Sequence, residues 1–145
     1  PRILMPTLNL HRASVGSIPN GNECILLVDD EAEIAQMERQ MLERLGYRVF
    51  ARSDSVRALA DFRSDPGRFD LVVTDMTMPK LTGDQLAAQI RRIAPNIPII
   101  LCTGFSERVD SEIARRIGVS EFLLKPLALE KLARTIRRLL DADRS

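Results

Sequence analysis

Five short apolar runs recur along the chain and alternate with longer stretches of helical periodicity. The runs, rich in valine, isoleucine and leucine, cover residues 24–28, 47–51, 71–74, 99–102 and 122–124. Unbroken apolar runs are typical of strands covered on both faces, whereas half-exposed strands alternate apolar and polar positions. The pattern therefore predicts five strands of a buried sheet.

The stretches that follow the runs carry apolar side chains three and four positions apart, as amphipathic helices do. These stretches cover residues 34–45, 55–63, 84–94, 109–117 and 129–140. In the first of them we expect Met37 and Met41 to lie in the core. The last has a wide apolar stripe with arginines opposite it.

Strict alternation of strand and helix predicts a parallel sheet with helices on both faces. Because crossovers between parallel strands are right-handed, only a few topologies remain. We predict a doubly wound, flavodoxin-like α/β fold, (βα)5, with strand order 2-1-3-4-5. In that order a functional site is expected at the carboxyl ends of the strands, beside the switch point between strands 1 and 3.

The chain has 145 residues, a length that fits one domain. We place this domain at residues 23–142, between a linker or disordered tail at residues 1–22 and a short tail at residues 143–145. The first tail is rich in proline and glycine and lacks the features of a signal peptide. Since the chain begins with Pro1 and not with methionine, we interpret it as a piece of a longer protein.

Composition and charge argue against several classes of protein. A net charge of +1 gives no electrostatic case for nucleic-acid binding, and no apolar run approaches the roughly 20 residues of a membrane span. Cys24 and Cys102 are too few for a disulfide framework or a four-thiolate zinc site, and we expect two buried thiols. His11 is the single histidine and lies far from any patterned segment. Serine–histidine–aspartate chemistry and histidine-rich metal sites are therefore excluded.

Polar residues stand where four of the predicted strands end. Asp29 and Asp30 follow the first run, Asp75 follows the third, Thr103 follows the fourth and Lys125 follows the fifth. Each one has a plain explanation, such as a helix cap or a solvated charge. Because the carboxyl ends of parallel strands share one edge of the sheet, we expect these five side chains to converge.

Clustered carboxylates repel one another unless one is protonated or a cation lies between them. An all-oxygen site with two or three carboxylates is what Mg²⁺ prefers. A metal flanked by Lys125 and the hydroxyl of Thr103 suits a charged phosphoryl group, and Asp75 is a candidate nucleophile for it. The chain has no glycine-rich phosphate loop, so nucleotide binding is not supported.

These residues resemble the receiver (response-regulator) domain of two-component signalling. The resemblance is carried by LLVDDE at residues 26–31, TDMTMP at residues 74–79 with the following Thr82-Gly83, CTG at residues 102–104 and KP at residues 125–126. It extends over residues 23–141.

The resemblance implies a role for each residue of the cluster. Asp75 would be the phosphoacceptor, and Lys125 would pair with the phosphoryl group. Asp29, Asp30 and Asp75, together with the backbone carbonyl of Thr77, would hold Mg²⁺, with Mn²⁺ as a substitute. The resemblance also implies a cis peptide bond between Lys125 and Pro126.

The resemblance further implies a two-state switch. Thr103 would turn toward the phosphoryl group and Phe122 would follow it inward, which would remodel the surface of the fourth helix, fifth strand and fifth helix. Homodimerisation through that surface is one expectation. We also raise the hypothesis that Phe105 shields the acyl phosphate from water, against the alternative that it packs on the fourth helix.

The partner implied by the family is a histidine kinase or a histidine phosphotransfer protein, and helix 1 is where such partners often dock. The TDMTMP run and the proline-rich linker are similar to receivers fused behind hybrid sensor histidine kinases, and this is the origin we favour. A stand-alone regulator or one with a DNA-binding output domain is the alternative. We expect a cytoplasmic location, with a tether to the membrane only through a sensor in the parent protein, and no contact of this domain with membrane or nucleic acid.

Three arginine pairs, residues 91–92, 115–116 and 137–138, fall in the last halves of predicted helices. Cations there complement the helix dipole and form a solvated face. A more specific alternative is that Arg115 and Arg116 help form a surface for a dimer or another partner, on the side of the fourth helix, fifth strand and fifth helix.

Two rival functions stay open at this stage. A small metal-dependent phosphatase with an aspartate nucleophile commonly needs a second acid two residues on, where this chain has Thr77. A receiver-like interaction module that is never phosphorylated typically lacks some of the five clustered groups. The domain itself is expected to be a switch and not a free-standing enzyme, although the parent chain could be a kinase.

Overall fold

The computed structural model of the chain describes residues 18–104 and 118–144. Its elements are β1 (Cys24–Val28), α2 (Ala32–Arg44), β2 (Arg48–Arg52), α3 (Ser55–Ser64), the short 3₁₀ helix η1 (Pro66–Arg68), β3 (Leu71–Asp75), α4 (Gly83–Ile93), β4 (Ile99–Thr103), β5 (Glu121–Leu124) and α6 (Leu129–Arg144). All five strands lie within one residue of their predicted positions. Asp75 and Thr103 are the last residues of their strands instead of the first residues after them.

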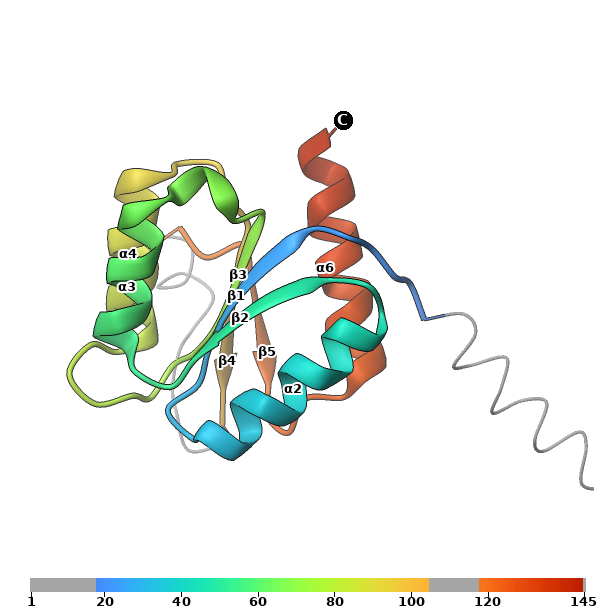
Figure 1. Cartoon of the computed structure of the whole chain (residues 1–145), viewed down its shortest axis with the longest axis horizontal. Helices are drawn as coiled ribbons and strands as arrows, with labels where there is room; N and C mark the ends of the chain where they lie inside the picture. The colour runs from blue at the N-terminus through green and yellow to red at the C-terminus, as the bar shows by residue number, and fades with distance from the viewer. Residues whose placement is uncertain (1–17, 105–117, 145) are drawn as a thin grey trace, which may run out of the picture.

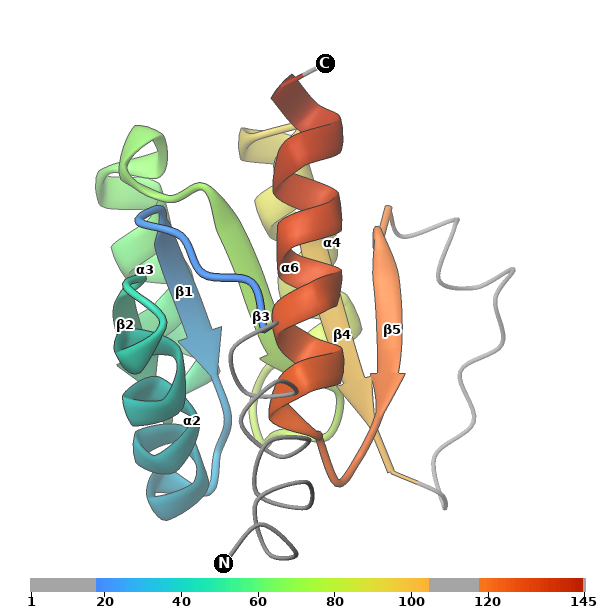
Figure 2. The ribbon, with the colours of Figure 1, turned by 90° about the vertical axis from the view of Figure 1, so that its right-hand side faces the viewer.

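The strands form one parallel sheet in the order β2-β1-β3-β4-β5, as predicted. Helices α3 and α4 cover one face of the sheet, and α2 and α6 cover the other (Figure 1). The strand arrowheads of β1, β3, β4 and β5 all lie at the same edge of the sheet (Figure 2). The doubly wound α/β fold is confirmed.

Two hydrophobic cores lie on the two faces of the sheet. The core under α3 and α4 contains Leu26, Phe62, Val72, Leu86, Ile90 and Leu101, and the core under α2 and α6 contains Ile25, Leu27, Val73, Ile100, Leu132 and Ile136. Neighbouring residues of β1 alternate between these cores, and every residue of β1 and β3 is buried. Burial on both faces is the reason that these strands are unbroken apolar runs.

Buried thiols are confirmed at both cysteines. Cys24 and Cys102 are free and buried in the structure. Burial raises the pKa of both thiols, so neither is poised as a nucleophile at neutral pH.

Two of the paired arginines, Arg91 and Arg137, are half-buried and hydrogen-bonded within the fold, which corrects the expectation of a wholly solvated face. The guanidinium of Arg91 donates to the carbonyls of Pro95, Ile97 and Gly118, at 2.8 Å, 2.6 Å and 3.1 Å. Arg91 therefore lies near the C-terminus of α4, where a cation is favourable. Its guanidinium binds carbonyls of the segments that follow the helix and is not free in solvent.

The second corrected arginine, Arg137, forms a two-pronged ion pair with the buried Glu23 at 3.1 Å and 2.7 Å. It also bonds Asp141 and the carbonyl of Asn20. This arginine thereby joins α6 to the segment that leads into β1, whereas its neighbour Arg138 lies exposed.

No helix among residues 18–104 and 118–144 is both long enough and apolar enough to span a membrane. Four residues singled out in the sequence, Phe105, Arg115, Arg116 and His11, lie outside the described residues.

Candidate functional site

Three carboxylates meet where β1 and β3 end. Asp29 and Asp30 follow the last residue of β1, and Asp75 is the last residue of β3. These strands are direct neighbours in the sheet, with Val28 paired to Thr74. One carboxylate oxygen from each acid lies within 4.8 Å of the others. The structure thus brings Asp75 together with two adjacent aspartates that stand more than 40 positions before it in the sequence.

Two of these acids are buried and fixed in place. Asp29 is 2% exposed and accepts a hydrogen bond from the backbone of Glu31 at 3.0 Å. Asp75 is 7% exposed and accepts one from the backbone of Met76 at 3.1 Å. Asp30 is exposed. The cluster therefore presents two fixed carboxylates and one that reaches solvent.

Lys125, the first residue after β5, completes the cluster. Its ammonium lies 3.1 Å from Asp29 and 3.2 Å from Asp75. Burial alone would lower the pKa of Lys125, but the hydrogen bond and charge of Asp29, together with Asp75, raise it above its ordinary value. Lys125 therefore stays cationic at any physiological pH. It follows that its charge partly offsets the repulsion among the acids.

Thr103 and Phe122, the two predicted switch residues, lie on neighbouring strands. Thr103 is buried at the end of β4, and its carbonyl accepts a hydrogen bond from the backbone of Lys125 at 2.7 Å. Phe122 is half-buried and packs on the core under α3 and α4. The peptide bond between Lys125 and Pro126 is cis. Thr77 lies exposed in the loop after β3.

Gly83, quoted in the sequence only as part of a motif, is a close-approach position of the site. Its backbone donates to the carbonyl of Met76 at 2.8 Å. A Cβ atom here would lie 2.1 Å from the carbonyl oxygen of Asp75, so no larger side chain fits without a shift. The absence of a side chain at the start of α4 lets that helix pack directly against the end of β3.

The donor set suits a hard divalent cation. Three carboxylate oxygens converge from adjacent strand ends, while sulfur and imidazole ligands are absent from the candidate group. Oxygen ligands with an open, solvent-facing side are what Mg²⁺ requires, because it retains part of its water shell. The residues present therefore fit the metal that the chemistry of the sequence predicts.

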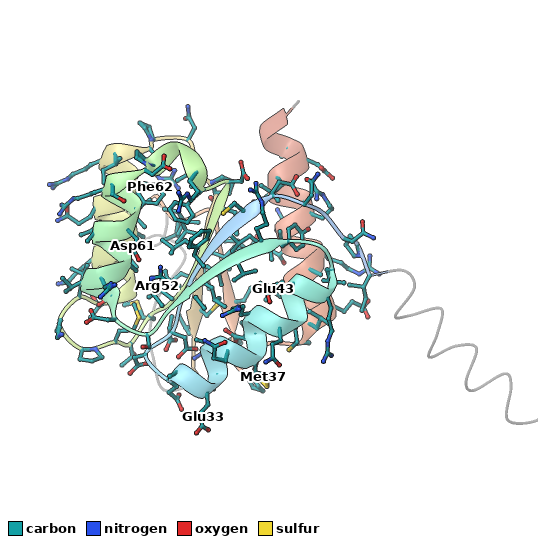
Figure 3. The ribbon with its side chains drawn as sticks, in the orientation of Figure 1. Glu33, Met37, Glu43, Arg52, Asp61 and Phe62 are labelled. Carbon is teal, nitrogen blue, oxygen red and sulfur yellow. The ribbon has the colours of Figure 1, made fainter. Side chains whose placement is uncertain are left out.

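A groove of about 350 Å³ opens beside the cluster, between α2 and the segment that joins β5 to α6. Its lining is mainly apolar and includes Ile34, Met37, Met41, Leu127, Leu129 and Leu132, with Lys125 among the lining residues. We name this the α2 groove. The expectation that Met37 lies in the core is wrong: it is 54% exposed on α2, where it lines the α2 groove (Figure 3).

Glu38, a residue that the sequence analysis missed, also lines the α2 groove. It takes a core-facing position of α2, together with Ala35 and Leu42, and is 6% exposed. Burial, followed by the charges of Asp29 and Asp75, raises its pKa to about 7, against the opposing effect of Lys125. No local signal marked it, because a glutamate within a helix is usually solvated.

The comparison with protein families identifies the class to which the fold belongs. The profile of the response regulator receiver domain matches residues 25–137. The chain therefore belongs to this family, and it is a receiver domain of two-component signalling, a switch and not a classic enzyme.

Particular relatives agree with this class. The alkaline phosphatase synthesis transcriptional regulatory protein PhoP of Bacillus subtilis is 31% identical over 119 residues, which cover 82% of this chain and 49% of that protein. The sensor kinase CckA of Brucella abortus is 30% identical, over 84% of this chain and 13% of that protein. The chain thus spans about half the length of the first curated relatives it matches.

Solved structures match nearly the whole domain. A receiver domain protein from Clostridium thermocellum superposes with a TM-score of 0.80 at 32% identity, covering 84% of this chain and 97% of that chain. A CheY-like receiver domain protein from Methanospirillum hungatei gives a TM-score of 0.79 at 26% identity, covering 86% and 98%.

Proposed function

We propose that this domain accepts a phosphoryl group from a phosphohistidine onto Asp75 and thereby switches between two surface states. The observation that carries the proposal is the contact of one ammonium, Lys125, with both Asp29 and Asp75 inside a three-carboxylate cluster. That arrangement holds a nucleophilic oxygen, a fixed positive charge and a divalent-cation site within one small volume.

The transfer is a displacement at phosphorus. A carboxylate oxygen of Asp75 attacks, a phosphorus–oxygen bond forms, and the bond from phosphorus to the donor imidazole nitrogen breaks. The released histidine takes a proton from solvent, and an acyl phosphate is left on Asp75. Lys125, already at 3.2 Å from Asp75, is placed to pair with the transferred oxygens.

Asp29, Asp30 and Asp75 would hold Mg²⁺, or Mn²⁺ in its place, with the backbone carbonyl of Thr77. When bound, the ion supplies positive charge that offsets the charge on the phosphoryl oxygens. The exposed carboxylate of Asp30 leaves the solvent side of the cluster accessible to the phosphodonor.

The switch would run through Thr103 and Phe122. Thr103 ends β4 beside β5, and Phe122 is paired with Leu101 in the same two strands. A turn of the Thr103 hydroxyl toward the phosphoryl group would free space for Phe122. The surface that would change comprises β5, α6 and residues 109–117, for which the sequence predicts a helix, and a homodimer through that surface is part of the proposal.

The donor would be a histidine kinase or a histidine phosphotransfer protein, and the parent chain a hybrid histidine kinase. The similarity to the sensor kinase CckA supports this origin weakly, since PhoP of Bacillus subtilis and ycf27 of Porphyra purpurea, two other relatives, are named as transcriptional regulators. A cytoplasmic location belongs to the same proposal.

The first test is the intact mass of the domain after incubation with Mg²⁺ and acetyl phosphate. Wild type is expected to gain one phosphoryl group, while Asp75→Asn and a chelated sample gain none. Asp65→Asn is the matched control, because Asp65 is an exposed aspartate that is not one of the three clustered carboxylates. It should be phosphorylated like wild type.

A gain of mass in Asp75→Asn would place the acceptor elsewhere. No gain in wild type, with Mg²⁺ binding still detectable by calorimetry, would contradict the proposal and favour an interaction module that works without phosphorylation.

A further inference from the structure

Glu38 differs from the other buried carboxylates of the described residues. Four carboxylates are buried there, namely Glu23, Asp29, Glu38 and Asp75. Glu23 pairs with Arg137, and Asp29 and Asp75 both pair with Lys125. Glu38 forms no hydrogen bond and no ion pair with any residue that the structure describes.

An unpaired buried carboxylate costs stability, because its charged form loses hydration without a compensating partner. The raised pKa of Glu38, about 7, reflects that cost. The charged groups that act on Glu38 from neighbouring elements are Asp29, Asp75 and Lys125. Lys125, the cation among the described residues whose charge acts on Glu38, is already engaged by both aspartates.

The α2 groove gives Glu38 access to a partner from outside the domain. Glu38 lies among apolar residues contributed by α2, such as Ile34 and Met41, and by the segment after β5, such as Leu127. From Glu31 to Met41 the groove follows α2 for about 15 Å, or roughly three helical turns. That length and lining suit one amphipathic helix laid in an apolar groove.

We propose that Glu38 pairs with one Lys or Arg on the helix that the phosphodonor protein lays in the α2 groove. Apolar side chains of that helix contact Met37, Met41 and Leu127, and its cation enters between them to reach Glu38. Lys125 lines the same groove, so a helix docked there lies beside the phosphoacceptor. This inference rests on the proposed function, since it assumes a histidine-bearing protein donor.

Charge complementarity is the reason to choose a cationic helix over an apolar one. A wholly apolar occupant would seal Glu38 from water and leave its carboxylate unpaired, at the full cost of desolvation. A cation on the docked helix removes the desolvation cost of the Glu38 carboxylate. Glu38 then also provides specificity, because a donor whose helix lacks the cation binds less tightly.

The experiment compares two phosphodonors on the same variants. One is acetyl phosphate, which needs no docking, and the other is a histidine phosphotransfer domain, phosphorylated in vitro and chosen because it transfers to wild type. The variants are Glu38→Gln, Glu38→Leu and Glu38→Lys. Glu33→Gln is the matched control, because Glu33 is an exposed glutamate of α2 outside the groove (Figure 3).

With the protein donor, Glu38→Gln and Glu38→Leu are expected to raise the half-saturating donor concentration at least tenfold. Glu38→Lys should raise it at least 100-fold, a loss of about 3 kcal/mol in binding free energy, because two like charges then meet. With acetyl phosphate the same variants should react no slower than wild type, because removing a negative charge near Asp75 favours an anionic donor. Glu33→Gln should change neither reaction by more than about twofold.

Two further readouts separate recognition from folding. Glu38→Leu should unfold at a higher temperature than wild type, since it replaces an unpaired carboxylate with an apolar side chain. Substituting the docking-helix lysines and arginines of the donor one at a time with glutamate should identify one position that restores transfer to Glu38→Lys.

Wild-type half-saturation in Glu38→Gln and Glu38→Leu would overturn the inference. So would equal slowing with both donors, which would assign Glu38 to the chemistry of Asp75 instead of to docking. If acetyl phosphate fails to phosphorylate wild type, the proposed function fails, and this outcome is distinct from the other two.

Discussion

Glu23 and Glu38 are both buried glutamates, but their pKa values move in opposite directions. The bidentate hydrogen bonds from Arg137 lower the pKa of Glu23 to about 2, against the effect of burial. Burial without a partner raises the pKa of Glu38 to about 7. At the scale of a single residue, the partner therefore decides whether a buried carboxylate stabilises the domain or destabilises it.

The Glu23–Arg137 pair predicts an acid-labile contribution to stability. Because the pKa of Glu23 falls from 4.5 to about 2 on folding, its contribution is complete above pH 4.5 and is lost as the pH falls toward 2. A shift of that size corresponds to about 3 kcal/mol. Glu23→Gln should therefore lower the free energy of unfolding by a few kcal/mol at pH 7 and by much less at pH 2.5, as measured by urea denaturation.

The matched comparison for this prediction is Arg137→Met against Arg138→Met. Arg138 pairs with Glu121 on the surface, where its side chain is 58% exposed, so its loss should cost under about 1 kcal/mol. Equal losses from the two arginine variants would contradict the assignment of stability to the buried pair.

At the scale of elements, the start of α4 and the end of β3 determine the shape of the site together. Thr82 begins the helix with its backbone bonded to the side chain of Gln85 at 3.0 Å. Gly83 then follows in contact with the backbone of Asp75. The position of the acceptor strand end therefore depends on a helix that contributes no reacting group.

Gly83→Ala should move the backbone of Asp75 or displace α4. We expect a loss of about 1–3 kcal/mol in the free energy of unfolding, as for other overpacked positions. Phosphorylation by acetyl phosphate should also slow at least severalfold. Gly67→Ala is the control, because a Cβ atom at Gly67 meets nothing within 4 Å, and it should match wild type in both assays. An unchanged phosphorylation rate in Gly83→Ala would show that this contact does not position the acceptor.

At the scale of the whole molecule, folding itself creates the cation site. In the unfolded chain Asp75 is far from Asp29 and Asp30, whereas in the fold their oxygens lie within 4.8 Å. The repulsion among them is a cost of folding that Lys125 offsets in part. A divalent cation that binds only the folded state should offset more of that repulsion and stabilise the domain.

Saturating Mg²⁺ should therefore raise the midpoint of thermal unfolding relative to a chelated sample. At a concentration of about 100 times the dissociation constant the expected gain is about 2.7 kcal/mol. Asp30→Asn should lose most of this response, while Asp65→Asn keeps it. If Mg²⁺ raised the unfolding midpoint of Asp30→Asn as much as that of wild type, Asp30 would not be a ligand of the proposed metal site.

Much of the site could be predicted from the sequence, because the positions of its residues depend on the local apolar pattern and on the common edge at which parallel strands end. Apolar runs mark the strands, and parallel strands end at one edge, so Asp29, Asp75 and Lys125 could be assigned to a common cluster before any contact was known. The roles of Thr77, Thr103 and Phe122 in a phosphorylated state stay predictions.

Only the tertiary structure determines the burial and the partners of residues whose neighbours come from distant parts of the chain. The rotation of α2 about its axis turns Glu38 inward and Met37 outward, although hydrophobicity alone favours the reverse. The hydrogen bonds of the half-buried Arg91 and Arg137 likewise depend on carbonyls and carboxylates up to 117 positions away. The type of each element can be predicted from the pattern of neighbouring residues in the sequence. Which side of a helix is buried, and which group pairs with a charged side chain, depend on how the elements pack against one another.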